Sequence, residues 1–250
     1  MKHLDGEYYV DINNVRHWVK IEGRGVLKTI PLLIIHGGPG GNHYTFERTV
    51  YYEQRGCGRS DKPESDEAYT IPELICDFNK IIQWLGVEKV GLLGYYFGAE
   101  LVMEFTYAYP QYIRKMILSA PSLISSDIGR LVQITSFMSI GDSKLSKQIH
   151  QWMIEERFDI NTLYKKVWDM ADTDTVDRLL FENQEVAKFN RKLWEESGLE
   201  NTGLMMKTLQ KCPVPCPLTD RLKAIKTPAL IMTGIHDRNT GLAIYNHIRS

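Results

Sequence analysis

The chain has 250 residues with almost balanced charge, 30 Lys and Arg against 31 Asp and Glu. Its composition, 43% hydrophobic and 24% charged, is that of an ordinary globular protein and excludes a disordered, collagen-like or disulfide-scaffold chain. Because no broad basic field is present, we expect no nucleic-acid partner. The first segment, MKHLDGEYYV, is not a signal peptide, no apolar run approaches the roughly 18 residues of a membrane span, and the 4 cysteines fit reduced thiols. We therefore expect a cytoplasmic protein without a membrane partner.

The first third of the chain is strand-like. Glu7–Asn13 and Val15–Glu22 are β-prone runs separated by an Asn-Asn turn, which predicts a hairpin. Ile30–Ile35 (IPLLII) is apolar throughout and too short for a helix, as is typical of a central strand buried on both faces. It ends in a glycine-rich loop, His36–Gly41.

Strand and helix patterns alternate from residue 30 to residue 120. The apolar residues of Ile71–Leu85 follow helical spacing along one stripe, and Gly86 ends that helix. The other segments are predicted strands at Thr49–Glu53, Lys89–Leu93 and Lys115–Ser119 and a predicted helix at Ala99–Ala108. This alternation predicts an α/β protein with a mostly parallel, twisted sheet and helices on both faces.

From about Ser122 to Lys211 the periodicity is only helical. Helices are predicted over Lys147–Arg157, Asn161–Ala171, Thr175–Glu185 and Val186–Glu196. Strand signals return at Pro228–Thr233, and a last helix runs through Ala243–Ile248. The simplest layout is an α/β core formed by residues 1–121 and 213–250, with a helical insertion over residues 122–212.

Three loops follow predicted parallel strands and should meet at the sheet edge where open α/β sheets bind ligands. His36–Gly41 offers unobstructed backbone N–H groups, as an oxyanion hole requires, or forms a flexible turn. Gly94–Gly98 has the glycine-x-nucleophile-x-glycine frame of a nucleophile elbow, with Tyr96 at its centre, or is an ordinary strand-to-helix turn. Asp237, in the third loop, is placed either to orient a histidine or to cap a helix.

These segments together resemble the α/β-hydrolase superfamily and, within it, the proline iminopeptidase group of serine aminopeptidases. The resemblance is carried by HGGPGG (His36–Gly41), YEQRGCGRSDKP (Tyr52–Pro63), Leu92–Pro121 and Leu218–Thr240. Glu53 stands where the family usually has Asp. The resemblance covers most of the chain and is weak in the helical block.

The resemblance implies a hydrolase that releases an N-terminal residue, often proline, from short peptides through an acyl-enzyme. Tyr96 would hold the nucleophile position and Asp237 would be the triad acid, with the amides of Gly38 and Phe97 forming the oxyanion hole. The substrate would be a peptide or a small acyl compound, and we expect no cofactor and no metal. Acidic residues of the helical cap would bind the substrate's α-amino group, or else form solvated helix faces; the candidates are Glu182, Glu185, Glu195 and Glu196.

Three departures from the family pattern predict impaired catalysis. First, Tyr96 brings a bulky phenol, with an ordinary pKa of about 10, to the position of a serine hydroxyl. Second, the triad histidine is absent: the chain stops 250 − 237 = 13 residues past Asp237, and His247 falls on the helix that follows it. Third, the link after Ile35 is too short for the usual helix, and the final strand of the fold is missing, which would expose sheet surface.

The remaining histidines do not supply the missing base. His36 is expected to shape its own turn, while His43 and His236 lie near the cleft by sequence but not at the family's base position. Three interpretations stay open: a member of the group with little or no peptidase activity, a non-catalytic pseudoenzyme that binds a peptide or small ligand, and a truncated product without function. The pattern does not decide whether the chain is an enzyme, or its oligomeric state.

Overall fold

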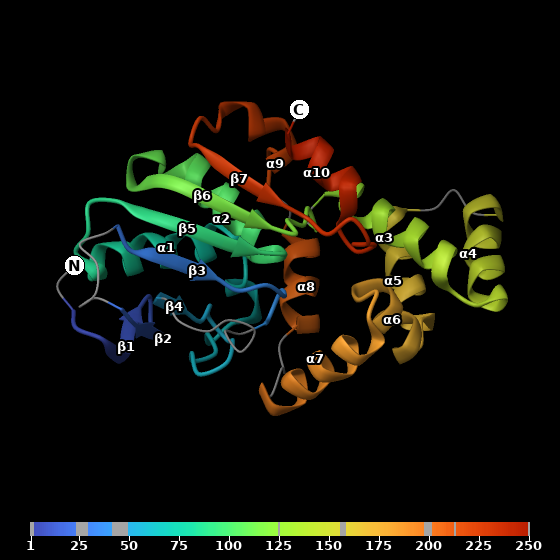
Figure 1. Ribbon diagram of the computed structural model, residues 1–250, viewed down its shortest axis with the longest axis horizontal. Helices are drawn as coiled ribbons and strands as arrows, with labels where there is room; N and C mark the ends of the chain where they lie inside the picture. Colours follow the sequence, from blue (N-terminus) through green and yellow to red (C-terminus); the bar gives the residue numbers. More distant parts are fainter. Residues whose placement is uncertain are drawn as a thin grey trace.

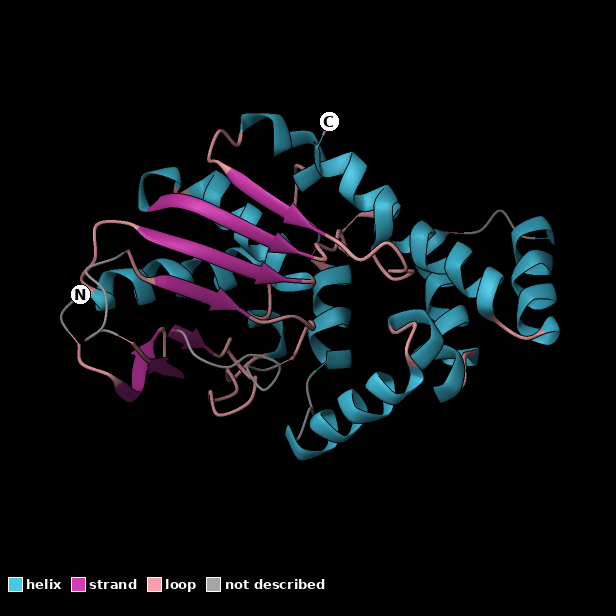
Figure 2. Ribbon diagram, in the orientation of Figure 1, coloured by secondary structure: helices cyan, strands magenta, loops and turns pink. Residues whose placement is uncertain are grey.

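The computed structural model describes residues 3–23, 30–41, 50–124, 126–155, 159–197, 202–212 and 214–249. Figures 1 and 2 show a twisted sheet backed by helices, with a block of further helices beyond one end of the strands. Of the short link expected after Ile35, residues 36–41 are described, whereas residues 42–49, and His43 among them, lie outside the described residues.

Seven strands of the described chain form one sheet in the order β1-β2-β4-β3-β5-β6-β7. β2 is antiparallel to both β1 and β4, and the strands from β4 to β7 are parallel to one another, so the predicted mostly parallel sheet is confirmed. The strands are β1 (Gly6–Ile12), β2 (Val15–Ile21), β3 (Leu32–Ile35), β4 (Val50–Tyr52), β5 (Val90–Tyr95), β6 (Ile113–Ser119) and β7 (Ala229–Met232).

The predicted hairpin is confirmed at β1 and β2. Ile12 pairs with Val15, leaving a two-residue loop in which Asn13 and Asn14 have φ values of 51° and 61°. Positive φ at both central residues defines a type I′ turn, whose twist matches that of the flanking strands. Asparagine tolerates this backbone conformation better than other residues with a side chain.

Two helices of the core, α1 (Ile71–Leu85) and α2 (Phe97–Ala108), pack against one face of the sheet, behind the strands in Figure 1. Their buried residues meet those of the strands, such as Leu33, Leu92 and Leu118, in the main hydrophobic core. The helices of the whole chain are α1 (Ile71–Leu85), α2 (Phe97–Ala108), α3 (Asp127–Ile140), α4 (Ser143–Glu155), α5 (Ile160–Met170), α6 (Thr173–Leu180), α7 (Gln184–Ser197), α8 (Thr202–Lys211), α9 (Leu218–Arg221) and α10 (Gly241–Arg249).

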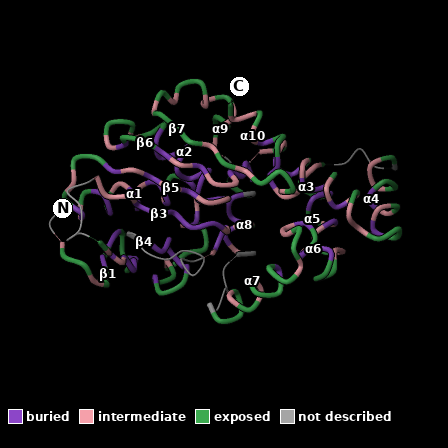
Figure 3. Tube along the Cα trace, in the orientation of Figure 1, coloured by how far each residue is buried: buried purple, intermediate pink, exposed green. Residues whose placement is uncertain are grey.

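The helical block has a hydrophobic cluster of its own. Helices α3 to α6 contribute to it, with Phe137, Ile149 and Val167 fully buried. α8 belongs to the main core instead, through Met205 and Leu209. Figure 3 shows the buried trace concentrated in the sheet and thinning toward α4 and α7.

The helix predicted over Thr175–Glu185 was wrong in its bounds. α6 ends at Leu180, and Phe181 is extended, with ψ 133°. The side chain of Asn183 then accepts a hydrogen bond from the amide of Glu185 (2.9 Å), which starts α7. A local cap of this kind competes with the apolar periodicity that placed the boundary between the two predicted helices at Glu185 and Val186.

The second face of the sheet carries a row of apolar side chains. Leu93, Ile117 and Leu230 are register partners on β5, β6 and β7, so they point to the same side. Leu230 is 54% exposed and Met232, further along β7, is 43% exposed. Among the described strands, β7 forms one edge of the sheet.

Candidate active site

The turn between β5 and α2 has the strained backbone of a nucleophile elbow. Tyr96 adopts φ 54° and ψ −115° immediately before α2 begins. Its amide donates to the carbonyl of Ser119 (3.0 Å), and its carbonyl accepts from the amides of Ala99 and Ser122, both at 3.1 Å. Positive φ is unfavourable for an aromatic residue, so these backbone contacts must hold it in place.

The two glycines of the elbow are required by close backbone approach. A Cβ on Gly98 would lie 2.2 Å from the carbonyl oxygen of Ile35, and a Cβ on Gly94 would lie 2.4 Å from the Cα of Ala99. The start of α2 and the end of β3 therefore touch directly, which leaves no room for any side chain at these positions.

The glycine-rich loop after β3 lies against the elbow. A Cβ on Gly37 would be 3.3 Å from the Cβ of Tyr96. Gly38 has φ 132°, and a Cβ there would lie 2.4 Å from the amide nitrogen of Gly40. The structure thus brings Gly38 and Phe97, the residues expected to form the oxyanion hole, to the corner of the sheet that carries Tyr96.

The hydroxyl of Tyr96 is hydrogen-bonded on both sides. It accepts from Nε2 of Gln133 on α3 (2.9 Å) and donates to Oδ1 of Asn239 in the loop after β7 (3.4 Å). Burial raises the pKa of Tyr96 well above its ordinary value of 10.0, because the charged phenolate would lose its hydration. The phenol is therefore held neutral, which makes it a poor nucleophile.

No imidazole is among the partners of this hydroxyl in the described chain. His36 is 1% exposed and engaged on both ring nitrogens, with Nδ1 2.8 Å from the carbonyl oxygen of Gly37 and Nε2 3.1 Å from the amide of Gln54. It shapes its own turn, as expected. His236 is exposed, and His247 lies on α10.

The carboxylate of Asp237 organises its own loop. Oδ1 accepts from the amides of Asn239 and Thr240, both at 2.9 Å, and Oδ2 accepts from the hydroxyl of Thr240 (2.7 Å). Asp237 orients Asn239, which contacts Tyr96, and α10 starts only at Gly241. As expected, no histidine accompanies Asp237 in the described chain; its carboxylate supports an asparagine instead.

Gln133 and Asn239 are the two residues of this site that sequence reasoning missed. Asn239 lies inside the Leu218–Thr240 segment, two residues after the expected acid, but no motif marks its amide. Gln133 is 3% exposed on a helix of the insertion, and only the packing of α3 over the elbow brings it to Tyr96. No sequence signal identifies it.

The QRGCGRS segment is a buried scaffold beside the site. Arg55 donates two hydrogen bonds of 2.7 Å to the carboxylate of Asp77 on α1. Glu53, fully buried, accepts from the amide of Arg59. Gln54 connects this scaffold to the glycine-rich loop through His36, so the motif supports the loop rather than supplying a reactive group.

The acidic candidates of the insertion lie mostly in solvent. Glu195 and Glu196 are exposed on α7, with Glu196 3.7 Å from Lys192, and Glu185 pairs with Lys188 on the same helix. Glu182 differs, because its carboxylate is 2.7 Å from Arg238 in the loop that carries Asp237. Of the four candidates, Glu182 is thus the one with a described ion pair to the loop of Asp237.

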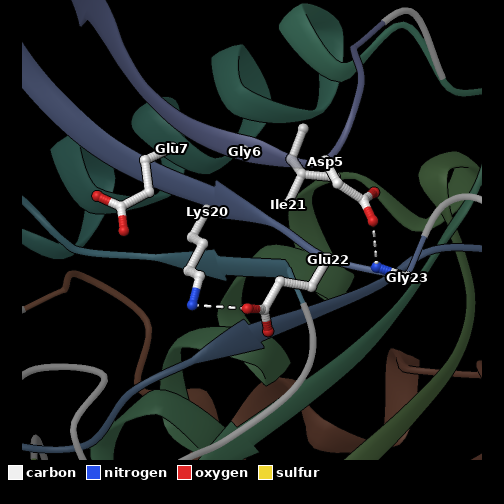
Figure 4. A pocket seen from close by; sticks show the side chains of 7 residues that line it. All are labelled: Asp5, Gly6, Glu7, Lys20, Ile21, Glu22 and Gly23. Carbon is white, nitrogen blue, oxygen red and sulfur yellow. Dashed lines mark hydrogen bonds and ion pairs between the residues drawn. The ribbon is translucent and has the colours of Figure 1, made fainter.

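A cavity of about 670 Å³ lies at the β1–β2 hairpin (Figure 4), away from the elbow. Its charged groups are engaged: Lys20 pairs with Glu22 at 2.6 Å, and Asp5 accepts from the amide of Gly23 at 2.9 Å. None of the sequence-predicted site residues lines it, so we do not place the site there. Its lining residues are Asp5, Gly6, Glu7, Lys20, Ile21, Glu22 and Gly23.

The fold and the elbow agree with the comparison to known families. A family model described as the alpha/beta hydrolase fold matches residues 30–238, more than half of the chain. The chain belongs to this α/β-hydrolase family. In the part of the chain that the structure describes, no helix is long and apolar enough to cross a membrane.

Its relatives include proline iminopeptidases. The enzyme of Lactobacillus delbrueckii subsp. bulgaricus is 29% identical over an alignment of 145 residues, and the match covers 51% of this chain and 49% of the relative. The chain thus spans about half the length of this curated relative. The proline iminopeptidase of Lactobacillus acidophilus is 28% identical over an alignment of 247 residues, and the match covers 87% of this chain and 78% of the relative.

The solved structures show the same fold. The crystal structure of a proline iminopeptidase-related protein from Thermus thermophilus covers 99% of this α/β-hydrolase chain, and the match covers 87% of that protein, with a TM-score of 0.76 at 24% identity. At this identity the likeness concerns architecture. The relationship to the proline iminopeptidase group is therefore carried by the sequence matches, and the arrangement of strands and helices by the structural ones.

Proposed function

We propose that this chain is a proline iminopeptidase relative that does not perform serine-hydrolase chemistry. The observation that carries the proposal is the state of Tyr96, whose neutral hydroxyl is bound to two amide side chains, Gln133 and Asn239, instead of to an imidazole. Without a base, a nucleophile loses proton transfer worth roughly 10²–10⁴ in rate. Without a competent nucleophile, only transition-state binding would remain.

In this proposal the helical insertion, residues 122–212, is a cap over a core made of residues 1–121 and 213–250. Support comes from the separate hydrophobic cluster of α3 to α6 and from the contact of Gln133 with the elbow. Gly38 and Phe97 would keep the oxyanion amides, and Tyr96 and Asp237 would occupy the nucleophile and acid positions without their chemistry. Glu195 and Glu196 would face solvent or a peptide amino group.

The ligand class follows from the relatives, which are named as proline iminopeptidases. A short peptide, or a small acyl compound, would bind at the elbow, beneath the helical insertion. No cofactor or nucleic acid enters this proposal. A cytoplasmic location would agree with the free thiols of Cys57, Cys76, Cys212 and Cys216.

The test measures turnover and labelling on the full chain. Incubation with a proline arylamide and with a fluorophosphonate probe should give no product and no labelled Tyr96, while the Lactobacillus acidophilus relative, run in parallel, serves as the positive control. Tyr96→Ser should also stay inactive, because no imidazole contacts this hydroxyl position in the described chain. Hydrolysis at ordinary enzyme rates, or labelling that Tyr96→Phe abolishes, would contradict the proposal.

A binding measurement separates a pseudoenzyme from a product without function. Titration calorimetry with a short peptide that begins with proline should show saturable binding. A peptide of the same composition with an acetylated N-terminus is the matched control, since it lacks the free amino group that defines the relatives' substrates. Absence of binding for both peptides would favour a product without function.

A further inference from the structure

The side chain of Tyr96 connects three parts of the chain that are far apart in sequence. We propose that this phenol is a built-in ligand, an autoinhibitory contact that holds the helical insertion closed over the elbow. The inference deepens the proposed non-catalytic function and rests on it, since a catalytic serine would have to be free at this position. Its partners come from α3 and from the loop between β7 and α10.

The orientation of the Gln133 amide in this contact is determined by one tryptophan. The indole Nε1 of Trp168 only donates, so the atom of Gln133 at 3.1 Å from it must be the oxygen, Oε1. Tyr164 donates to the same oxygen at 2.9 Å. The amide nitrogen of Gln133 therefore faces Tyr96 and donates to its hydroxyl, whose own proton goes to Asn239.

The Gln133 side of the contact is buried, whereas Tyr96 and Asn239 are half-buried, so the network is hardest to exchange for water at Gln133. Gln133 is 3% exposed and Tyr164 is 7% exposed. Both acceptor positions of the Gln133 oxygen and one of its two amide protons are used within the protein. Breaking one member of such a network leaves buried polar groups without partners and costs more than an exposed hydrogen bond.

A second link joins the insertion to the same loop. Arg238, one residue before Asn239, pairs with Glu182 at 2.7 Å and donates to the carbonyl of Arg178 at 3.3 Å. Glu182 lies between α6 and α7, whereas Gln133 lies on α3. The loop after β7 thus holds the insertion directly through Arg238 and indirectly through Asn239 and Tyr96.

A ligand that enters between insertion and elbow must displace the phenol. Because Tyr96 already offers an aromatic ring and a hydroxyl to Gln133 and Asn239, the space it fills accepts a phenol. Removing the side chain should therefore leave a site for a free phenol, with the same donor and acceptor, and the binding of that phenol should restore the closed state.

The first experiment removes only the hydroxyl. In Tyr96→Phe, hydrogen exchange by mass spectrometry should show roughly five- to tenfold faster exchange in α3, α5 and residues 237–241, as expected for loss of one or two net hydrogen bonds. The matched control is Tyr52→Phe, whose buried hydroxyl has no partner among the described residues. Unchanged exchange in Tyr96→Phe, or equal changes in both variants, would overturn the proposal.

The second experiment replaces the side chain with a free molecule. Tyr96→Ala should show a saturable rise in Tm and recovered exchange protection with phenol, and a smaller effect with benzene, which lacks the hydroxyl. Wild type, with its site filled, should show neither effect. Equal responses to phenol and benzene, or none, would contradict the proposal. These outcomes do not depend on turnover, so they separate failure of this inference from failure of the proposed function.

Discussion

The guanidinium of Arg55 and the carboxylate of Asp77 form a buried ion pair, with two hydrogen bonds of 2.7 Å and exposures of 2% and 0%. His17 approaches the same carboxylate at 3.5 Å. The pair joins the turn after β4 to α1, and the neighbouring Gln54 contacts His36 of the glycine-rich loop, so the pair supports the segment that holds this loop. Its effect on the free energy of unfolding is largest when one partner is removed, because the other charge then stays buried with weaker compensation.

We expect Asp77→Ala to lower the free energy of unfolding by about 3–5 kcal/mol, because buried Arg55 would keep only the half-exposed Glu73, at 3.2 Å, as an ion-pair partner. Urea unfolding followed by circular dichroism at pH 7 measures the loss. The matched control is Asp61→Ala, which removes an exposed pair with Arg16, 52% and 47% exposed, and should cost about 0–1 kcal/mol. Similar losses in the two variants would contradict the role of burial.

Stability should fall as the pH drops below 6.5. Burial lowers the pKa of His17, and the nearby Asp77 only partly opposes this shift. Below the ordinary histidine pKa of about 6.5, the unfolded chain binds a proton that folded His17 does not, so the free energy of unfolding decreases by up to about 1.4 kcal/mol per pH unit. Folded His17 therefore contributes stability that is fully present only above that pH.

Urea unfolding at pH 7.5 and pH 5.5 measures this dependence. His17→Gln should reduce the difference between the two pH values, whereas His236→Gln, which alters an exposed side chain, should leave it as in the wild type. An unchanged difference in His17→Gln would show that other groups set the dependence.

Gly98→Ala should destabilise the protein by about 2 kcal/mol or more, because its Cβ would lie 2.2 Å from the carbonyl oxygen of Ile35 and 2.5 Å from that of His36. The matched control is Gly234→Ala, where the nearest atom would be 3.8 Å away and the change should be small. Thermal unfolding compares the two variants. If both have the wild-type Tm, the close contact of elbow and β3 is not as described.

Leu230→Ser should reduce self-association without loss of stability. Leu230 is 54% exposed on β7, beside Ile117, so its side chain adds apolar surface to an edge strand. Light scattering as a function of concentration should decrease, while the free energy of unfolding changes by less than about 0.5 kcal/mol. Leu131→Ser on α3, 45% exposed, is the control and should not alter scattering. A larger decrease in light scattering for Leu131→Ser than for Leu230→Ser would place the self-associating surface on the insertion.

The sequence predicted an element with its correct bounds where residues within or next to that element define it. Ile71–Leu85 forms a helix with the predicted bounds, since one apolar stripe and a glycine with φ 63° at Gly86 define it locally. The hairpin predicted at Asn13-Asn14 is confirmed for the same reason, because its two-residue turn is defined locally. Bounds failed at Thr175–Glu185, where α6 already ends at Leu180 and Asn183 caps α7, which starts at Gln184 instead of the predicted Val186.

The sequence by itself determined the sheet, the elbow glycines and the glycine-rich loop, because each depends on short-range patterning and on the absence of a side chain. It also predicted that Tyr96 would lack a histidine. Only the tertiary structure decided what takes the place of that histidine: Gln133 and Asn239 reach the phenol through the packing of α3 and of the loop after β7. Gln133 and Asn239 are 37 and 143 positions away from Tyr96 in the sequence. Hydrogen bonds across such separations depend on how whole elements pack, which no local pattern of residues records.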